Sequence, residues 1–338
     1  MEDLGRKWTR PLKSHQNFPP YDLGDEDIVR EAYARTKTIE RIYHKGHDLA
    51  WNGPEILKEL TAKHGGIHFP EEKKEAFGKM ASILLWGELA AWSVSADIAL
   101  RLNDVEAKMA ASSQVFDEAR HFHTLREYLW QAGVPIQKLG GYSHQVLVTL
   151  LKTDNLLHKL VGMQLMIEST AVCLFKTIAE AELEPVLTDL LYYFERDEAR
   201  HVGLGALMLP KILADLNGLD AAKLWMFQMR VNLLMVAGGL TMRETSAKLG
   251  IDQSAMQLQA FKMQREIFSR MHDQLPDEPR GRATKGLFGL NRKGQDRINA
   301  FLFPRDGAPE WHGRTMKTLI AAAKRGDTWL AKRNQRTI

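Results

Sequence analysis

The chain has 338 residues, of which 44% are hydrophobic and 26% are charged, the usual balance of a globular protein that can bury a sizeable core. Its single cysteine, Cys173, excludes an internal disulfide framework, and the polar first residues contain no apolar run of the kind found in signal peptides. A net charge of only +4, without a recognised binding module, predicts no nucleic-acid partner. These features together predict a cytoplasmic protein.

Helices are predicted along nearly the whole chain. Residues 1–24 contain several prolines and form an arm, and an amphipathic helix is expected from Asp25 to residue 51. After a loop at 63–72, helical periodicity dominates as far as residue 272, with almost no β-type alternation. The further predicted helices cover 72–102, 105–132, 142–151, 153–182, 185–214, 219–246, 252–273 and 312–333. Four of them are much longer than the average of ~11–12 residues, which is typical of a helical bundle.

The apolar stretch at 80–100 has the length of a membrane span. It contains Glu88 and Asp97, however, and carboxylates inside a bilayer are costly. We therefore expect no membrane span but a buried helix of a large all-α core. Within such a core the carboxylate of Glu88 needs a partner, because buried charges are paired or bind metal.

The string Asp-Glu-Ala-Arg-His occurs twice, at 117–121 and at 197–201. Each copy contains Glu-x-x-His, and the i,i+3 spacing places both side chains on one face of a helix. One such pair is weak evidence in a chain with 12 histidines. Two pairs in the same five-residue context indicate a shared role for Glu118 with His121 and for Glu198 with His201.

Two further acids, Glu88 and Glu168, lie 30 residues before Glu118 and Glu198 in apolar surroundings. The midpoints of these intervals fall in the expected turns, so each helix pair folds back with its two acids level, about 20 Å from the turn. The alternative is that the buried acids pair with neighbouring arginines. We predict a metal site instead, formed by Glu88, Glu118, His121, Glu168, Glu198 and His201.

This pattern resembles the ferritin-like di-iron carboxylate superfamily, in which four helices supply Glu, Glu-x-x-His, Glu and Glu-x-x-His. The motif is most similar to those of multicomponent monooxygenases, ribonucleotide reductase small subunits and acyl carrier protein desaturases. Leu125 stands where the reductase subunits have a radical tyrosine, and the C-terminus lacks their docking tail, so the reductase assignment is rejected. The resemblance implies two iron ions and does not distinguish Fe/Fe from Mn/Fe.

The resemblance implies an all-α fold, a ferritin-like four-helix bundle with additional flanking helices. The bundle is expected over 72–273, after an N-terminal arm and helix over 1–71 and before a basic C-terminal extension over 274–338. Positive charge is concentrated after Pro276, with fourteen Lys/Arg against six Asp/Glu. This extension is either a solvated surface or a docking face for an acidic partner.

The resemblance also assigns roles to residues around the metals. Asp117 and Asp197 are expected to support the ligand histidine of the opposite half, with Arg120 and Arg200 neutralising them. Glu195 shares the ligand face of its helix and is expected to relay protons, although a solvent-facing position is equally compatible with the sequence. An apolar lining for an organic substrate is expected, although plain core packing is the favoured alternative for any single one of its candidate residues: Leu84, Ala91, Trp92, Leu125, Leu165, Val172, Phe194, Leu204 and Gly205.

The predicted function is that of a non-haem di-iron oxidase or oxygenase, which uses O2 to hydroxylate, desaturate or N-oxygenate an organic substrate. A ferroxidase or iron-handling protein without an organic substrate is the alternative. The expected partners are a small-molecule or acyl-type substrate and an external electron donor such as a ferredoxin or flavin reductase. The basic extension further suggests an acidic carrier protein, and the sequence allows a homodimer.

Overall fold

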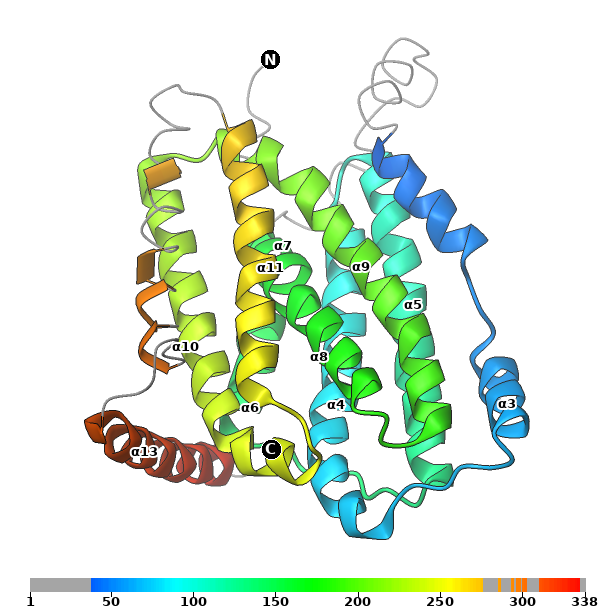
Figure 1. The fold of residues 1–338 in the computed structure, drawn as a ribbon. Coiled ribbons are helices and arrows are strands. Elements are labelled where there is room, and N and C mark those ends of the chain that lie inside the picture. The colour runs from blue at the N-terminus through cyan, green and yellow to red at the C-terminus, as the bar shows by residue number, and fades with distance from the viewer. Residues whose placement is uncertain are drawn as a thin grey trace.

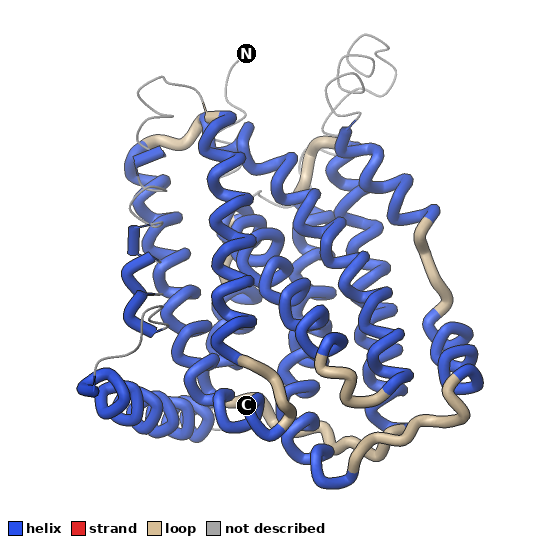
Figure 2. The backbone as a smooth tube through the Cα atoms, viewed as in Figure 1, coloured by secondary structure: helices blue, strands red, loops and turns tan. Residues whose placement is uncertain are grey.

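The computed structural model describes residues 38–275 and 310–334, and between them residues 285–286, 293–294, 296–298 and 300–302. Within these ranges the chain forms helices and connecting loops and no strand (Figure 2). The predicted all-α fold is therefore confirmed. The proposed domain boundaries at residues 71 and 273 stay predictions.

The centre of the molecule consists of two antiparallel helix pairs (Figure 1). The first pair is α4 (Glu71–Arg101) with α5 (Val105–Gln131), and the second is α8 (Glu168–Glu180) with α9 (Pro185–Ala214). Both turns have a residue that caps the following helix: the side chain of Asp104 accepts a hydrogen bond from the Ala107 N–H, and that of Glu184 from the Leu187 N–H. These caps explain why the structure has its turns where the sequence predicts them, before residues 105 and 185.

The segment before α8 departs from the single helix predicted over 153–182. Asn155 caps a short helix α7 (Leu156–Leu160), so helical structure begins three residues later than expected. The next turn, η1 (Val161–Ile167), is π-helical and leads directly into Glu168. Such π-helical insertions are often found at functional sites.

Flanking helices lie on both sides of the central pairs (Figure 1). They are α3 (Gly53–Lys63), α6 (Gly141–Lys152), α10 (Gly218–Lys248), α11 (Gln253–Gln274) and α13 (Glu310–Asn334). Helix α3 was not predicted, because the Asn-Gly-Pro-Glu stretch was interpreted as the end of the preceding helix. In the structure this stretch also begins a new helix: Asn52 caps α3, and a proline occupies its first turn. Of the helix expected over 25–51, the described part is helical at 38–48.

Helix α13, in the basic C-terminal region, packs against α6 and α10. The Tyr142 N–H donates a hydrogen bond to the Asp327 carboxylate at 2.8 Å, and Lys324 forms an ion pair with Glu244 at 2.6 Å. Met316 and Ala323 pack with Leu240 in a small apolar cluster. The described part of the extension is thus attached to the bundle by both polar and apolar contacts.

Two helical segments, α4 and Leu156–Glu180, are long and apolar enough to cross a membrane by length and composition alone. Each carries a buried acid, Glu88 or Glu168, and packs inside the bundle. The other acid of α4, Asp97, pairs with Lys159 at 2.8 Å and with Arg101 at 3.1 Å. We therefore describe both segments as core helices, and the expected lack of a membrane span stays a prediction.

His158 gives a test of packing between α7 and α10. Its ring stacks on Phe227 with the centroids 4.3 Å apart, and burial lowers its pKa from 6.5 to about 4. As the pH falls, His158 is protonated at a higher pH in the unfolded chain than in the folded protein. Its contribution to the free energy of unfolding is therefore complete above pH 6.5 and is lost as the pH falls towards 4. We expect urea unfolding midpoints to decrease less between pH 7 and pH 5 in His158→Phe than in the wild type. Equal decreases in both proteins would contradict this packing.

Candidate metal centre

Six acids and imidazoles from the two helix pairs meet in the middle of the bundle. None of the six side chains belongs to a residue more than 5% exposed. They form two overlapping groups, each with ligand-type atoms within 4.8 Å of one another, and Glu118 and Glu198 belong to both groups. Glu88 and His121 complete one group, and Glu168 and His201 complete the other. The structure thus brings together all six residues that the sequence singled out as metal ligands.

Several of these atoms are buried without a hydrogen-bond partner among the described residues. They include Oε2 of Glu88, Oε2 of Glu118 and Nδ1 of His121. The Nδ1 atom of His121 lies 3.2 Å from a Glu198 oxygen, and that of His201 lies 3.2 Å from a Glu118 oxygen. Buried polar atoms without partners are costly unless a ligand satisfies them. Convergent carboxylate oxygens and imidazole nitrogens are a donor set that suits iron or manganese, so the residues fit a dinuclear metal centre.

The pKa values show how unfavourable this cluster is without cations. Burial raises the pKa of Glu88 to about 8, and the charges of Glu198 and Glu118 act in the same direction. Burial and the same two charges raise the pKa of Glu168 well above its usual range. For His121 burial acts to lower the pKa, but contacts with Asp197, Glu198 and Glu88 outweigh it and raise the pKa well above 6.5. Protons therefore compete for the positions that divalent cations would take.

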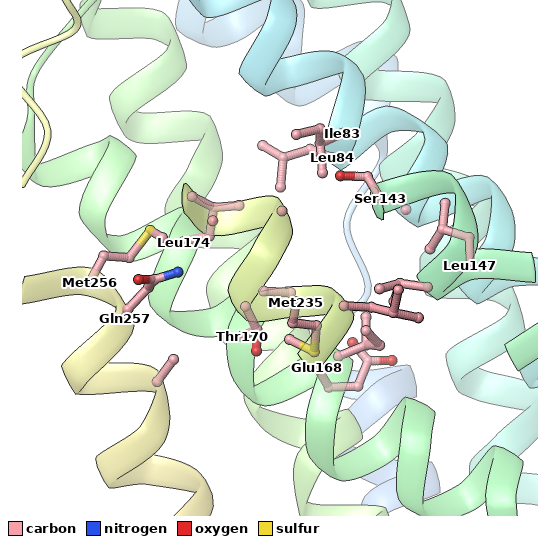
Figure 3. A pocket seen from close by; sticks show the side chains of 18 of the residues that line it. Ile83, Leu84, Ser143, Leu147, Glu168, Thr170, Leu174, Met235, Met256 and Gln257 are labelled. Carbon is pink, nitrogen blue, oxygen red and sulfur yellow. The ribbon is translucent and has the colours of Figure 1, made fainter. Parts of the chain in front are cut away.

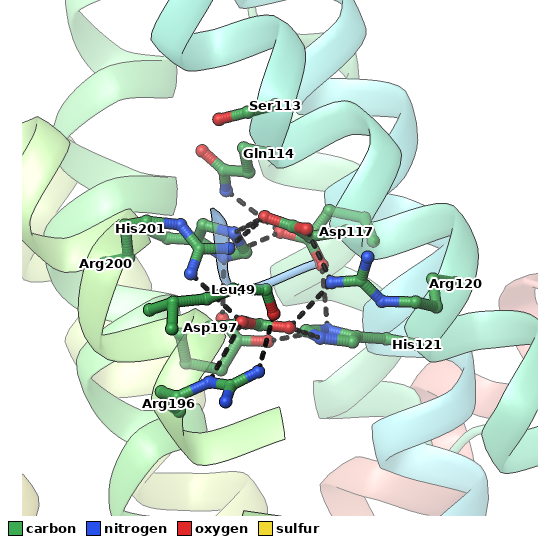
Figure 4. A network of polar contacts seen from close by, with 12 residues as sticks. Leu49, Ser113, Gln114, Asp117, Arg120, His121, Arg196, Asp197, Arg200 and His201 are labelled. Atoms are coloured by element: carbon green, nitrogen blue, oxygen red, sulfur yellow. Dashed lines mark hydrogen bonds and ion pairs between the residues drawn. The ribbon is translucent and has the colours of Figure 1, made fainter. Parts of the chain in front are cut away.

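A network of two aspartates and two arginines lies behind the histidines (Figure 4). Nε2 of His121 is 3.2 Å from Asp197, and Nε2 of His201 is 3.1 Å from Asp117, so each histidine contacts the aspartate of the opposite half. Arg120 donates to Asp117 at 2.6 Å and to Asp197 at 2.8 Å. Arg200 likewise contacts both aspartates.

This arrangement fixes the orientation of both imidazoles. Burial opposes ionisation of the two aspartates, but the contacts with the histidines and with Arg200 keep their pKa values below the usual range. An ionised aspartate accepts the Nε2–H of its histidine and leaves Nδ1 directed at the glutamates. The geometry places Asp117 and Asp197 beside the histidines of the opposite halves, and the supporting role expected of them in catalysis stays a prediction.

Trp51, in the loop before α3, was not predicted as part of the site. Its indole N–H donates to Asp197 at 2.8 Å, and the Arg120 guanidinium lies 4.6 Å from its ring centroid. The ring also packs beside Tyr193 and Phe194 of α9. No motif marks Trp51, because the contact depends on a loop that is distant in sequence from α9.

Two buried glutamines were also missed. The Gln114 amide donates to Glu118 at 2.9 Å and to Glu168 at 2.7 Å, and the Gln164 amide donates to Gln114 at 2.6 Å. A signal was available in the sequence, because each glutamine precedes a predicted ligand by four residues, one helical turn.

An apolar cavity of about 220 Å³ extends from the glutamates between α4, α6, α10 and α11 (Figure 3). All four cluster glutamates line it, and neither cluster histidine does. Of the expected lining residues, Leu84 and Ala91 face this cavity, whereas Trp92 is 37% exposed. The other residues do not line it. Core packing, the favoured alternative for each single residue, is what the structure shows for Leu125, Leu165, Val172, Phe194 and Leu204, and Gly205 packs against Gln164.

Glu195 lies outside both groups of ligand-type residues and does not line the cavity. It is half-buried, and burial raises its pKa although the charge of Lys176 on α8 acts in the opposite direction. The structure therefore does not bring Glu195 to the cluster, and a proton-relay role stays a prediction.

No family model matches the chain, and no curated protein matches it in sequence. Solved structures do match. A protein with aldehyde deformylating oxidase activity from Synechococcus is 14% identical, with a TM-score of 0.52, over 65% of this chain and 98% of that chain. An R2-like ligand-binding oxidase with an anaerobically reconstituted Mn/Fe cofactor is 15% identical, with a TM-score of 0.57, over 70% of this chain and 93% of that chain.

The chain has the ferritin-like fold of these oxidases. An aerobically reconstituted Mn/Fe form of the R2-like oxidase also matches, at 17% identity and a TM-score of 0.53 over 70% of this chain and 94% of that chain. The buried Glu/His cluster agrees with the Mn/Fe cofactor named for these neighbours. At such identities the likeness establishes the fold, and the chemistry has to be argued from the chain's own residues.

The two overlapping groups predict unequal effects of removing single ligands. Glu88→Ala should abolish tight binding at one position and leave one metal ion per chain, because Glu88 belongs to one group. Glu118→Ala should weaken both positions, because its carboxylate is shared. Metal content after loading with Fe(II) or Mn(II) checks both expectations. Glu195→Ala, one turn from Glu198, is the control and should retain two ions; the same loss in all three variants would contradict the assignment.

Proposed function

We propose that the chain is an oxidoreductase with a dinuclear metal centre, which uses O2 to oxidise an apolar organic substrate. The observation that carries this proposal is the direct contact between a buried metal-type cluster and an apolar cavity. An oxidant formed at the glutamates would meet an organic molecule before it met bulk water. Hydroxylation, desaturation and N-oxygenation all fit this arrangement.

The residues that would hold the metals follow from the two groups. Glu88 and His121 would bind one ion, Glu168 and His201 the other, and Glu118 and Glu198 both. When bound in their reduced state, two iron ions, or a manganese and an iron, supply the electrons with which O2 is activated. The protein orients both imidazoles through Asp117 and Asp197 and keeps the substrate side apolar.

The cavity wall favours an organic substrate over iron handling. Its sides are formed by residues such as Leu147, Leu174 and Met235, and the Gln257 amide of α11 lies farther from the cluster (Figure 3). Iron(II) ions entering by this route would meet few ligands, whereas a small apolar or acyl-type molecule could occupy the cavity volume of about 220 Å³. A ferroxidase would instead need a polar entry path, so it remains the second candidate.

Electrons for repeated turnover must come from outside, and a ferredoxin or flavin reductase is part of the proposal. An acidic carrier protein that binds the basic C-terminal region would deliver an acyl substrate. Pull-down with acyl carrier protein at low and high salt tests this part separately, and binding that does not depend on salt would exclude it.

Oxygen uptake by the reduced protein tests the proposed activity. Protein loaded with two Fe(II) per chain, or with Mn(II) and Fe(II), should consume O2 rapidly, and with a reductant should convert an apolar compound to an oxidised product found by mass spectrometry. Glu118→Ala should consume O2 no faster than free metal. Continued conversion of added Fe(II) to a mineral, with no oxidised organic product, would support the ferroxidase instead.

Gly87 allows a test of the cavity itself. It lines the cavity beside Glu88, and a Cβ added there would meet no atom within 4 Å. Gly87→Leu should therefore fill space without disturbing the helix and lower kcat/KM for the apolar substrate about tenfold, the effect of ~1.4 kcal/mol. Metal content should not change. Gly203→Leu, which also has free space but lies outside the cavity lining, is the matched control, and equal effects in both variants would contradict the location of the substrate.

A further inference from the structure

Gln114 and Gln164 form a buried amide pair against one half of the metal-type cluster. Gln114 is 1% exposed and Gln164 is fully buried. Both oxygens that Gln114 contacts belong to carboxylates of Glu118 and Glu168, so only its NH2 group can face them. Its own oxygen accepts from the Gln164 amide at 2.6 Å. The second glutamine therefore fixes the first in the orientation that donates two hydrogen bonds to the acids.

The amide pair has no counterpart in the other half of the repeat. The two halves are related by a shift of 80 residues, as Glu118 and Glu198 show. By this shift Gln114 corresponds to Phe194, and Gln164 corresponds to Leu84. Both of these are buried apolar residues. Two amides thus lie on the side of Glu168 and His201, whereas apolar side chains occupy the matching places near Glu88 and His121.

Room for Gln164 comes from a glycine on α9. A Cβ at Gly205 would lie 2.5 Å from Cβ of Gln164, so α9 and η1 can approach this closely only with glycine there. The corresponding residue of the other half is Leu125, which is fully buried. The difference between the halves is therefore built into the backbone packing as well as into the hydrogen bonds.

We propose that Gln114, held by Gln164, is a positioning residue that makes the two metal positions unequal. The inference rests on the proposed metal centre, and the position of Glu168 and His201 is the one that Gln114 supports. Two N–H donors restrain the carboxylates of Glu118 and Glu168, so Glu168 is held ready for the ion that it shares with His201. The carboxylate of Glu88 has no amide donor of this kind among the described residues: its Oε2 lies 3.3 Å from Nδ1 of His121, which is itself a ligand-type atom of the same position. The position of Glu168 and His201 is the more preorganised of the two.

The experiment isolates each position before the amide is removed. Glu88→Ala leaves the position of Glu168 and His201, and Glu168→Ala leaves that of Glu88 and His121. Gln114→Leu is then added to each, and binding of Co(II) and Mn(II) is followed by calorimetry and by the visible absorption of Co(II). We expect Gln114→Leu to weaken binding about 10- to 100-fold in the Glu88→Ala background, the usual effect of losing a partner of a metal ligand. In the Glu168→Ala background it should weaken binding less than about threefold, since Glu118 alone loses a donor.

Gln228→Leu is the matched control, because Gln228 is a glutamine with 1% exposure and its amide nitrogen has no hydrogen-bond partner among the described residues. It should leave both affinities unchanged. Equal weakening of both positions by Gln114→Leu, or no weakening of either, would overturn the inference. If Gln114→Leu does not fold, Gln164→Met is used instead. It retains Gln114 but removes the hydrogen bond that orients its amide, and it decides between the same outcomes. Absence of metal binding in the wild type would instead overturn the proposed function.

Discussion

Four glutamates buried in one place impose the constraint on which the rest of the structure depends. The two aspartates of the same region are balanced by Arg120 and Arg200, which contact both of them. No lysine or arginine forms an ion pair with the four glutamates in the described part of the chain, where their ion-pair partners are the two histidines. Two imidazoles carry at most two positive charges, which do not balance four carboxylates, whereas two divalent cations do. Burial and the charges of Glu198 and Glu118 raise the pKa of Glu88 to about 8, so a proton competes with a cation there.

The long helices follow from the same constraint. A cluster that excludes water must lie several turns from any loop, so each central helix needs its acid near its middle, with apolar residues on both sides. Glu88 is in the middle of α4, and Glu198 is in the middle of α9. The exception is Glu168, which lies where the π-helical turn joins α8. Gln164, which donates to Gln114, lies in the same π-helical turn, so the acid and its support share one departure from α-helical geometry.

The central helices and the six ligand-type residues could be predicted because they depend on spacing along the chain. The repeat identified the two Glu-x-x-His pairs, and the turns between the helices showed which acids lie level with them. Trp51 and the amide pair could not be predicted in the same way, because their contacts join segments that are far apart in sequence: Trp51 reaches Asp197, and Gln164 reaches Gln114. The full lining of the cavity could not be predicted for a similar reason. Its outer wall is made by α10 and α11, and nothing in their sequence says which face of the bundle they cover.

The arrangement of charges gives the centre two distinct sides. The cavity is bounded by the four glutamates, while the histidines, aspartates and arginines lie away from it. A substrate in the cavity would therefore meet carboxylates and not the imidazoles, which the aspartates hold fixed. Trp51 acts on Asp197 behind one histidine, and Gln114 acts on two of the acids. A nearly symmetric repeat thus becomes an asymmetric site through contacts that the repeat itself does not contain.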